Sequence, residues 1–350
     1  MDTEWICFDA VTGYDKGELN HAAQILRQGG LVAFPTETVY GLSGDGFNPQ
    51  AAKKIYEAKG RPSDNPLILH ISKREELDAI AARIPRTAEK LMDAFWPGPM
   101  TLIFEKTKAV PYETTGGLDT VAVRMPSHEG ARQLIESAGV PVAAPSANTS
   151  GRPSPTTAEH VKEDLWGRID MIIDGGLVGI GVESTIIDVT EETPTILRPG
   201  HITKNMIAKV IGTVQMDAGL SGLDQSVKPK APGMKYRHYA PKASMTVIQG
   251  KKEAVIRRIE ELAAEYPKEK VGILAADETL SCYTHGQVVS AGSRNEHTIE
   301  QGLYRALREF DHMGVSVIFS ESFADDDRSE AIMNRLLKAA GQKIEYLSDK

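Results

Sequence analysis

Two short apolar runs near the N-terminus constrain the fold of this chain more than any other feature. Leu31–Phe34 is long enough for a buried β-strand, and Pro35 ends that strand because proline has no N–H to donate to a ladder. A second apolar run, Leu67–Ile71, contains His70. The residues between the two runs have helical character, so the sequence predicts a strand, a helix and a second strand of an α/β fold.

The segment between these strands carries the residue types that begin and end a helix. Asn48 is a suitable N-cap and Pro49 a suitable first residue. Gly60 is a typical stop signal for the helix. Lys59 and Arg61 are therefore expected to project from the helix end into the loop that follows.

The segment that follows the first predicted strand is polar. It carries the side chains of Thr36, Glu37, Thr38 and Tyr40. Gly41 and Gly44 follow, and we expect them to allow a tight turn of the backbone. The predicted strand and helix would then place the hydroxyl groups that follow the strand close to the cations Lys59 and Arg61 at the helix end.

Helical and strand-like segments alternate over the rest of the chain, which predicts two α/β domains. In residues 1–212 strands alternate with helices in places and run in pairs elsewhere, which favours an open, twisted mixed sheet covered by helices. Residues 213–243 include the stretch KPKAPGMKYRHYAPK, which is rich in proline and basic residues, and are expected to form a linker. In residues 244–350 the alternation predicts a small, Rossmann-like parallel sheet.

Composition and charge narrow the class of protein. Apolar residues make up 41% and charged residues 25% of the 350 residues, which is typical of globular proteins. The net charge of -8 opposes nucleic-acid binding, so a polyanion would have to bind at a local cationic cluster.

Cys7 and Cys282 lie far apart with no CxxC neighbour, so we expect neither a zinc site nor a disulfide framework. No apolar run approaches the ~20 residues that span a bilayer, and the N-terminus lacks a signal pattern. We expect a cytoplasmic protein that does not contact membranes.

The first candidate site is the cation pair beside the predicted helix end. Lys59 and Arg61, followed by Asn65 and His70, suit a triphosphate, because arginine donates in a fork and lysine acts as a point charge. The alternative for Lys59 and Arg61 is a solvated helix end, where cations favour the helix dipole. The alternative for His70 is a core histidine whose hydrogen bonds are satisfied.

Polar loops further along the chain are weaker candidates. Ser146 lies in PSAN and not in the G-x-S-x-G context of a hydrolase nucleophile, so its hydroxyl and the Asn148 amide are better suited to hydrogen bonding. An ordinary polar loop is the alternative. Gly176–Gly181 resembles a phosphate loop, but it opens into a strand and so fails the context of a dinucleotide site. Arg124, at a predicted strand end, is a candidate buried cation or a surface arginine.

Six motifs occur in order along the first part of the chain. They are TETVYGL, KGRPSDNPL, VRMP, PSAN, ESTIID and LRPG. Together they resemble the YrdC-like family of L-threonylcarbamoyl-AMP synthases, over about residues 16–211. The later APGMKYRHYAP and the C-terminal part resemble the longer, two-domain branch of that family. Six motifs in order are not a chance agreement, whereas the C-terminal part is less specific.

The resemblance implies an enzyme, an L-threonylcarbamoyladenylate synthase, which is a nucleotidyltransferase. Family members condense L-threonine, bicarbonate or CO2, and ATP into threonylcarbamoyl-AMP and release pyrophosphate. The product serves the threonylcarbamoyladenosine modification of tRNAs that read ANN codons, through a downstream threonylcarbamoyl transferase complex. The first domain is expected to surround a large positive cavity. Mg²⁺ is expected to arrive with ATP, held mostly by phosphates and water, and no ligand set for a permanent metal is visible in the sequence.

The resemblance also assigns roles to residues. Lys59 and Arg61 are expected to offset charge at the α-phosphate and the departing pyrophosphate, where loss of one donor typically costs ~3 kcal/mol of barrier. The expected ATP contacts are Arg61, Asn65, Thr120, Ser146, Ser154, Arg198 and Tyr236. The expected threonine contacts are Thr38, His70, Arg124, the backbone of Ala144, and Ser184. Thr36 and Asn148 are expected in the same cavity. Because the reaction depends on positioning and charge stabilisation, the protein needs no activated nucleophile.

The predicted linker alternates basic and aromatic residues, among them Lys235, Tyr236 and Tyr239. A plain spacer between domains is one interpretation. The other, which the resemblance favours, is a flap that folds over the cavity with Tyr236 touching the nucleotide. Closure would slow hydrolysis of a labile carbamoyl adenylate.

Two other functions are weighed against this hypothesis. An RNA-binding module is one, because the proposed cavity is basic; the net charge argues against it, and direct tRNA binding stays open. A carbamoyltransferase that makes a carbamoyl adenylate from carbamoyl phosphate is the other. Related proteins of that kind carry acylphosphatase, zinc-finger or kinase-like domains, and the two lone cysteines argue against such a fusion.

Overall fold

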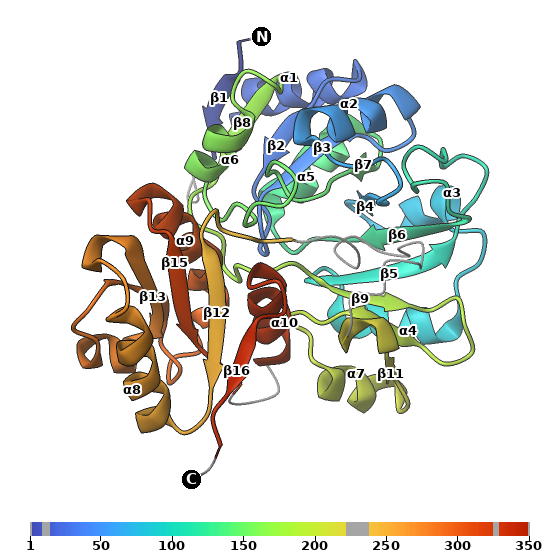
Figure 1. Ribbon diagram of the computed structural model, residues 1–350. Coiled ribbons are helices and arrows are strands. Elements are labelled where there is room, and N and C mark those ends of the chain that lie inside the picture. The colour runs from blue at the N-terminus through green and yellow to red at the C-terminus, as the bar shows by residue number, and fades with distance from the viewer. Residues whose placement is uncertain (1, 9–14, 222–237, 325–328, 349–350) are drawn as a thin grey trace. The chain divides into compact units, whose positions relative to one another are not determined.

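The computed structural model describes residues 2–8, 15–221, 238–324 and 329–348, which form two compact units (Figure 1). One unit comprises Met1–Ser150 and Ser154–Tyr236, and the other comprises Gly151–Pro153 and Arg237–Lys350. We call them the N-terminal and C-terminal domains. Each has its own β-sheet and its own hydrophobic core.

The N-terminal domain is built on a mixed sheet of eleven strands, in the order β1-β8-β2-β3-β7-β4-β6-β5-β9-β10-β11. The strands are β1 (Glu4–Cys7), β2 (Val32–Phe34), β3 (Gly41–Asp45), β4 (Ile68–His70), β5 (Met100–Glu105), β6 (Thr120–Arg124), β7 (Val142–Ala143), β8 (Met171–Asp174), β9 (Thr185–Asp188), β10 (Thr195–Arg198) and β11 (Gln215–Met216). The helices are α1 (Lys16–Arg27), α2 (Pro49–Lys59), α3 (Leu77–Ile80), α4 (Arg86–Phe95), α5 (Glu129–Ala138), α6 (Ala158–Leu165) and α7 (Lys204–Ile211), with the short 3₁₀ turns η1 (Arg74–Glu76) and η2 (Ala218–Ser221).

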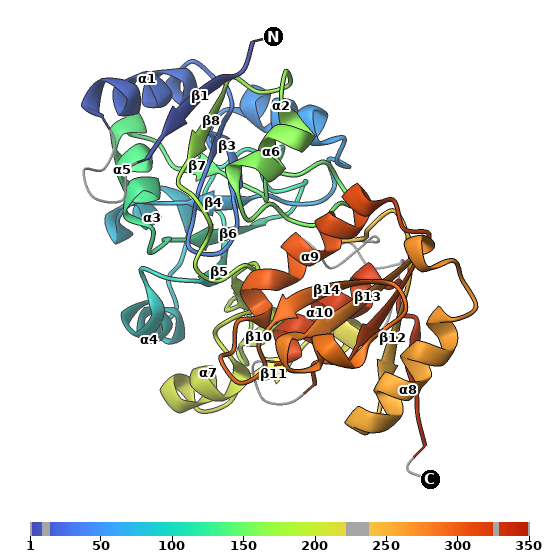
Figure 2. The same ribbon diagram turned by 90° about the vertical axis from the view of Figure 1, so that its left-hand side faces the viewer.

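Helices cover both faces of this sheet because successive side chains of a strand point to opposite sides. In β2, Val32 and Phe34 pack with α1 and α5, whereas Ala33 packs with the larger core under α2, α4 and α6. Figure 2 shows α1 and α5 side by side on their face of the sheet. The expected open, twisted mixed sheet is confirmed.

Local signals place α2 as the sequence predicts. The Asn48 side chain accepts from the Gln50 N–H, and Pro49 begins the helix. Gly60 ends it in the left-handed conformation, with φ +60°. Lys59 and Arg61 are thereby held on either side of a fixed backbone turn.

The expected tight turn at Gly41 and Gly44 is wrong. Both residues belong to β3, which pairs antiparallel with β2, and the chain turns earlier, in the polar segment after Pro35. A Cβ at Gly44 would lie 3.1 Å from Leu31 and 3.2 Å from Ala51. Glycine at this position therefore allows close packing of β3 and not a change of backbone direction.

The C-terminal domain is a five-stranded parallel sheet in the order β14-β13-β15-β12-β16. Its elements are β12 (Ser244–Gln249), α8 (Lys252–Ala263), η3 (Lys268–Lys270), β13 (Val271–Ala276), η4 (Asp277–Cys282), β14 (Gln287–Gly292), α9 (Ile299–Met313), β15 (Val317–Glu321), α10 (Ser329–Ala339) and β16 (Ile344–Tyr346). Val271 and Ile273 pack with α8, while Gly272 faces Phe310 of α9, so helices cover both faces. This confirms the Rossmann-like sheet.

The boundary of the expected linker needs a correction. β11 lies inside residues 213–243, yet it pairs parallel with β10 as the last strand of the N-terminal sheet. The backbone N–H groups of Gln215 and Asp217 donate to Pro194 and Ile196, and Met216 packs against the domain core. Residues 222–237 of the expected linker, including Tyr236, lie outside the described residues.

Four short strands, β1, β3, β11 and β16, are absent from the sequence prediction. β1, β11 and β16 lie at sheet edges, whereas β3 lies inside the N-terminal sheet between β2 and β7. The sequence pattern of residues 74–83 also favours a helix, but the structure forms only the turn η1 followed by the single-turn α3 there. Within the described residues, no helix has the length and apolar character that crossing a membrane requires.

Candidate active site

The predicted site residues gather where four neighbouring strands of the N-terminal sheet come together. Strand register places His70 of β4 beside Arg124 of β6, and Arg124 beside Thr101 of β5. Thr101 in turn lies beside Ile186 of β9, two residues after Ser184. Residues that are far apart in sequence therefore form one row across β4, β6, β5 and β9.

A chain of hydroxyl groups leads into this row from the turn after β2. Thr36 donates its hydroxyl hydrogen to the Val39 carbonyl (2.6 Å), so the hydroxyl of Thr38 must donate to Thr36 Oγ1 (2.9 Å). Thr38 Oγ1 is then oriented as an acceptor, and Arg124 Nη1 donates to it at 2.9 Å. The structure thus joins three residues that the sequence analysis placed in the cavity.

Arg124 is a buried cation and not a surface arginine, since it is only 4% exposed. Its Nε–H donates to the Gly98 carbonyl (3.3 Å), and its Nη2 pairs with Glu37 Oε1 at 2.7 Å. Burial acts to raise the pKa of Glu37, but the charge and hydrogen bond of Arg124, with the Ser127 N–H, outweigh it and lower the pKa to about 2. Glu37 is therefore ionised at neutral pH.

His70 is buried and neutral. Desolvation and the nearby Arg124 charge lower its pKa to about 3. Its Nδ1 lies 3.2 Å from the Ile68 carbonyl, and because a carbonyl only accepts, this contact places the hydrogen on Nδ1. Nε2 then carries the lone pair, so His70 can accept a hydrogen bond but not donate one from that nitrogen.

A second arginine reaches the same row from β10. Arg198 Nε donates to the Ser184 carbonyl (3.0 Å) and Nη2 to Ser184 Oγ (3.1 Å). Ser184 Oγ also lies 2.7 Å from Thr101 Oγ1. Beside this group, the buried Ser154 hydroxyl donates to Glu183 Oε1 at 2.5 Å. These contacts bring three residues of the predicted site, Arg198, Ser184 and Ser154, into the row or near it.

Lys59 is more deeply built into the fold than a solvated helix end. It is 2% exposed, and its Nζ donates to the Ser146 and Asn148 carbonyls. The Ser146 hydroxyl donates to Asn148 Oδ1 at 2.6 Å. Lys59 thus holds the PSAN loop, and the hydrogen-bonding roles expected of Ser146 and Asn148 agree with these contacts. The bridge between Gly41 and Ser146 brings this loop to the start of β3.

The remaining predicted residues lie further from these contacts. Arg61 Nη2 donates to the Asn65 and Pro66 carbonyls, at 3.3 and 3.1 Å. Asn65 is 2% exposed, and its Oδ1 has no hydrogen-bond partner among the described residues. Thr120 begins β6, four residues before Arg124, so the two share a face roughly 13 Å apart. Ala144 follows β7, and its backbone N–H donates to the Ile68 carbonyl.

Sequence reasoning did not assign a role to Glu37, Glu183 or Thr101. Glu183 is a buried carboxylate and the side chain of Glu37 is only 13% exposed, so the site is not uniformly positive. Both lie inside the quoted motifs, in TETVYGL and ESTIID, where a charged residue directly after or before a buried strand was the available signal. Thr101 carried no signal, since its role arises only from the pairing of β5 with β6 and β9.

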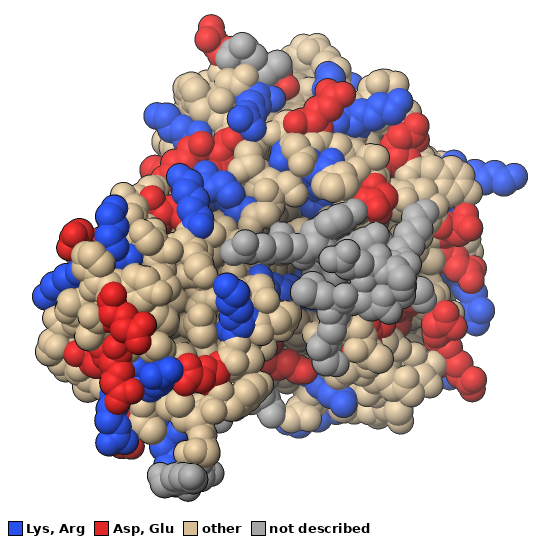
Figure 3. All heavy atoms as spheres, in the orientation of Figure 1, with Lys and Arg blue, Asp and Glu red and all other residues tan. Residues whose placement is uncertain are grey.

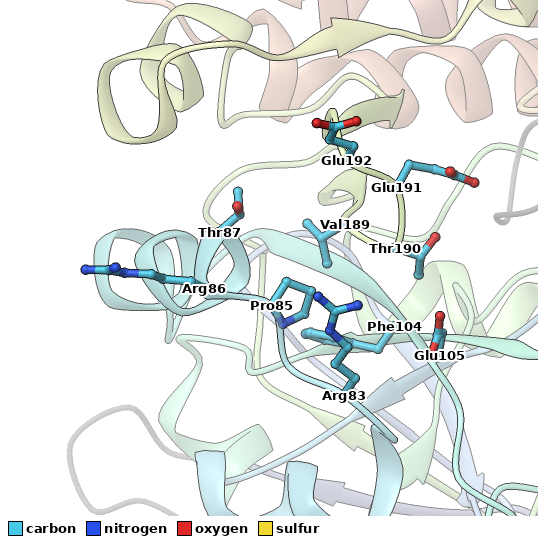
Figure 4. A pocket seen from close by; sticks show the side chains of 10 residues that line it. All are labelled: Arg83, Pro85, Arg86, Thr87, Phe104, Glu105, Val189, Thr190, Glu191 and Glu192. Carbon is cyan, nitrogen blue, oxygen red and sulfur yellow. The ribbon is translucent and has the colours of Figure 1, made fainter.

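Two hollows lie elsewhere on the described surface. One, of about 420 Å³, lies between the loop before α4, the end of β5 and the turn after β9 (Figure 4). Arg83 points into it, while Arg86 points away, and three glutamates share the rim. The other, of about 250 Å³ in the C-terminal domain, is lined by Arg294 and Glu321, which pair at 2.9 Å. Neither offers the concentration of buried cations and hydroxyls found in the row.

The outer surface agrees with the charge balance of the chain. On the face drawn in Figure 3, basic and acidic side chains are interspersed, without an extended basic stripe. Among the described residues, no group of three or more His, Cys, Asp or Glu side chains is arranged to hold a metal ion.

The fold is that of a two-domain α/β protein whose N-terminal sheet carries one row of buried arginine, histidine and hydroxyl side chains. The model of the Sua5/YciO/YrdC family, described as "Telomere recombination", matches residues 24–200, and that of the "Threonylcarbamoyl-AMP synthase, C-terminal domain" matches residues 202–341. The chain belongs to this family, in its two-domain form. The resemblance noted from the motifs is therefore confirmed.

Individual relatives agree with the family assignment. A threonylcarbamoyl-AMP synthase of Pyrococcus abyssi is 49% identical over 332 residues, which cover 94% of this chain and 96% of the relative. One of Bacillus subtilis is 50% identical over 331 residues, covering 93% and 94%. The crystal structure of P. abyssi Sua5 complexed with L-threonine matches with a TM-score of 0.93 at 46% identity, covering 99% of this chain and 100% of that one.

Proposed function

We propose that this chain synthesises L-threonylcarbamoyl-AMP from L-threonine, bicarbonate or CO2, and ATP, with release of pyrophosphate. The observation that carries the proposal is the near full-length identity of 49% to a relative named threonylcarbamoyl-AMP synthase. The match to a homologue crystallised with L-threonine supports the amino-acid substrate.

The row across β4, β6, β5 and β9 is the proposed threonine site. Arg124 binds the α-carboxylate in a fork, because a planar guanidinium matches a carboxylate in two parallel hydrogen bonds. Thr38 accepts from Arg124, and Ser184 lies 2.7 Å from Thr101, the residue paired with Arg124 in the sheet. Neutral His70 offers Nε2 as an acceptor to a substrate hydroxyl or amine. The backbone of Ala144 completes the proposed contacts.

The proposed ATP site extends from the PSAN loop. Lys59 and Arg61 bind the triphosphate and stabilise charge on the α-phosphate and the leaving pyrophosphate. Mg²⁺ enters with ATP, held by phosphate oxygens and water. The other proposed nucleotide contacts are Asn65, Thr120, Ser146, Ser154, Arg198 and Tyr236, with Thr36 and Asn148 nearby. The buried, unpartnered Oδ1 of Asn65 supports its place among them.

The proposed chemistry needs positioning more than reactive side chains. The threonine ammonium loses one proton to solvent, and the resulting amine nitrogen bonds to the carbon of CO2 and releases a second proton to solvent, which leaves a carbamate. A carbamate oxygen then bonds to the α-phosphorus while the bond from that phosphorus to pyrophosphate breaks. Holding three reactants in one geometry supplies most of the acceleration in reactions of this type.

A direct assay tests this proposal. Pure protein is incubated with ATP, bicarbonate and labelled threonine, and both pyrophosphate and a threonine-bearing adenylate are measured. We expect both products to depend on threonine and to be lost when it is omitted, with serine as the comparison substrate. ATP breakdown at the same rate without threonine would refute the substrate assignment.

The proposed role of the product is in the threonylcarbamoyladenosine modification of tRNAs that read ANN codons. A downstream threonylcarbamoyl transferase complex would receive the adenylate, so this chain need not hold the tRNA. The interspersed charges in Figure 3 support that division of roles for the face shown. Tight tRNA binding by this chain alone, falling steeply with added salt, would instead favour the RNA-binding alternative.

A further inference from the structure

Glu37 lies in the proposed amino-acid site but has no role in the proposed reaction. Its side chain is 13% exposed, and Oε1 both pairs with Arg124 Nη2 and accepts from the Ser127 N–H. Its other oxygen, Oε2, is buried and has no hydrogen-bond partner among the described residues. One oxygen of the Glu37 carboxylate is thus enclosed by the described residues without a donor among them.

Such an arrangement is a poor way to stabilise a fold. A buried ion pair must overcome the cost of removing both charges from water, and a buried oxygen without a partner adds to that cost. Apolar residues of similar volume often serve stability as well or better. What the ion pair between Glu37 and Arg124 does provide is a fixed orientation of the Arg124 guanidinium.

Three contacts hold the guanidinium of Arg124 on different sides. Gly98 accepts from Nε, Thr38 accepts from Nη1, and Glu37 faces Nη2. A guanidinium has five N–H donors in a plane, so further N–H groups on Nη1 and Nη2 remain for a ligand. Two such donors match the two oxygens of a carboxylate.

We propose that Glu37 is the positioning residue of the amino-acid site, which sets the plane of Arg124 and balances its buried charge before the substrate carboxylate arrives. Because Oε2 is enclosed, Glu37 acts through Arg124 and not by touching the substrate. The inference rests on the proposed function, in which Arg124 binds the carboxylate of threonine. It adds a residue to that site and predicts a specific kind of defect.

The charge of Glu37 is the part of the side chain that matters. Its low pKa keeps it ionised throughout the neutral range, so Glu37→Gln removes the charge while preserving the shape. Glu37→Asp keeps the charge, but its side chain is one methylene shorter, so the carboxylate lies farther from Arg124. Glu136, an exposed residue of α5, provides the matched control Glu136→Gln, which removes the same charge from the same domain.

The experiment measures steady-state kinetics of adenylate synthesis by the full chain and its variants, with threonine and ATP varied separately. We expect Glu37→Gln to raise KM for threonine about 10-fold or more, because misoriented binding groups cost factors of this order. kcat at saturating threonine and KM for ATP should stay within about twofold of wild type, as losses of uniform binding do. The KM for threonine of Glu37→Asp should lie between those of wild type and Glu37→Gln, and the KM of Glu136→Gln should equal that of wild type.

A ligand without a carboxylate separates this role from general loosening of the site. Threoninol replaces the carboxylate of threonine with a hydroxymethyl group, so it lacks the group that Arg124 would bind. In calorimetric titrations, Glu37→Gln should weaken L-threonine and leave the weak binding of threoninol as in wild type. Equal weakening of both ligands, or a loss in kcat in place of KM, would show a structural role and overturn the inference.

The outcomes also separate this inference from the proposed function. Unchanged threonine affinity in Glu37→Gln, with an active wild type, overturns the positioning role alone. Wild-type protein that binds threonine in a Glu37-dependent way but forms no adenylate overturns the proposed function alone. Wild-type protein that binds no threonine overturns both. If Glu37→Gln fails to fold, an unaltered KM for threonine in Glu37→Asp would overturn the positioning role.

Discussion

At the residue scale, the direction of each hydrogen bond around Arg124 is fixed by chemistry. The Thr36 hydroxyl has one hydrogen, which it donates to the Val39 carbonyl. The Thr38 hydroxyl must therefore donate to Thr36 Oγ1 and accept from Arg124. Thr38 and Arg124 lie 86 positions apart in the sequence. The motifs identified both residues, but only the fold showed that they bind each other.

The fork geometry of Arg124 gives a first prediction. Arg124→Lys keeps the charge but loses the planar donor pair, so it should weaken threonine binding about 10- to 100-fold, as expected for lost hydrogen bonds to a charged group. ATP affinity should be unchanged. Calorimetry with L-threonine measures the effect, and Arg168→Lys, on the exposed turn after α6, is the control. Wild-type affinity in Arg124→Lys would exclude a carboxylate-binding fork.

The buried, neutral state of His70 predicts a dependence of stability on pH. Its pKa is about 3 in the folded domain, against an ordinary 6.5. Below pH 6.5 the unfolded chain therefore binds a proton that the folded chain does not, so stability falls as the pH drops. His70 alone contributes at most about 1.4 kcal/mol per pH unit to this slope.

Urea unfolding between pH 7.5 and 5 tests this dependence. His70→Asn should flatten the slope below pH 6.5, whatever its effect on stability at pH 7.5. Glu37 acts in a lower window, because its pKa is depressed from 4.5 to about 2 and its stabilisation is lost only as the pH falls through that range. An unaltered slope in His70→Asn would contradict the buried neutral state.

At the element scale, α2 and its C-terminal turn position the proposed triphosphate site. Gly60 adopts φ +60°, and the N–H of Arg61 donates to the Tyr56 carbonyl across the turn. Asn48, Pro49 and Gly60 predicted this helix because capping depends on neighbouring residues only. By contrast, β3 was missed, because its glycines serve packing against other elements.

The turn at Gly60 gives a prediction with a closely matched control. A Cβ at Gly60 meets nothing within 4 Å, so Gly60→Ala adds only the strain of a left-handed alanine, about 1 kcal/mol. Gly139, which ends α5 at φ +70°, is equally open. Both substitutions should lower the free energy of unfolding by about the same amount.

Only Gly60→Ala should also raise KM for ATP, because only that turn carries Lys59 and Arg61. Urea unfolding and steady-state kinetics with ATP varied measure the two effects. An equal change in KM for ATP in Gly60→Ala and Gly139→Ala would show that the turn at Gly60 has no specific part in nucleotide binding.

At the scale of the whole molecule, each domain has its own core. The apolar clusters of the N-terminal domain draw on residues up to Met216, and that of the C-terminal domain begins at Ile248. Gly151–Pro153 is the exception, since it belongs to the C-terminal unit, where buried Arg308 donates to the Pro153 carbonyl at 2.7 Å.

Separate cores predict that a fragment of residues 1–221 folds on its own. It should unfold in one cooperative transition in urea, followed by circular dichroism. A fragment of residues 238–350 should fold as well but be less stable than the same domain in the full chain, because it lacks the acceptor at Pro153. Failure of the first fragment to unfold cooperatively would show that its core depends on the C-terminal domain.

The sequence by itself determined the order of most helices and strands, both sheet types and the family, because hydrophobic periodicity and capping are local and the six motifs occur in order. Only the tertiary structure decided that Lys59 holds the PSAN loop, that Glu37 faces Arg124, and that β11 completes the first sheet. These are pairings across long stretches of chain. A carboxylate acquires its role from the cation that packing brings to it, and no local pattern specifies which cation that is.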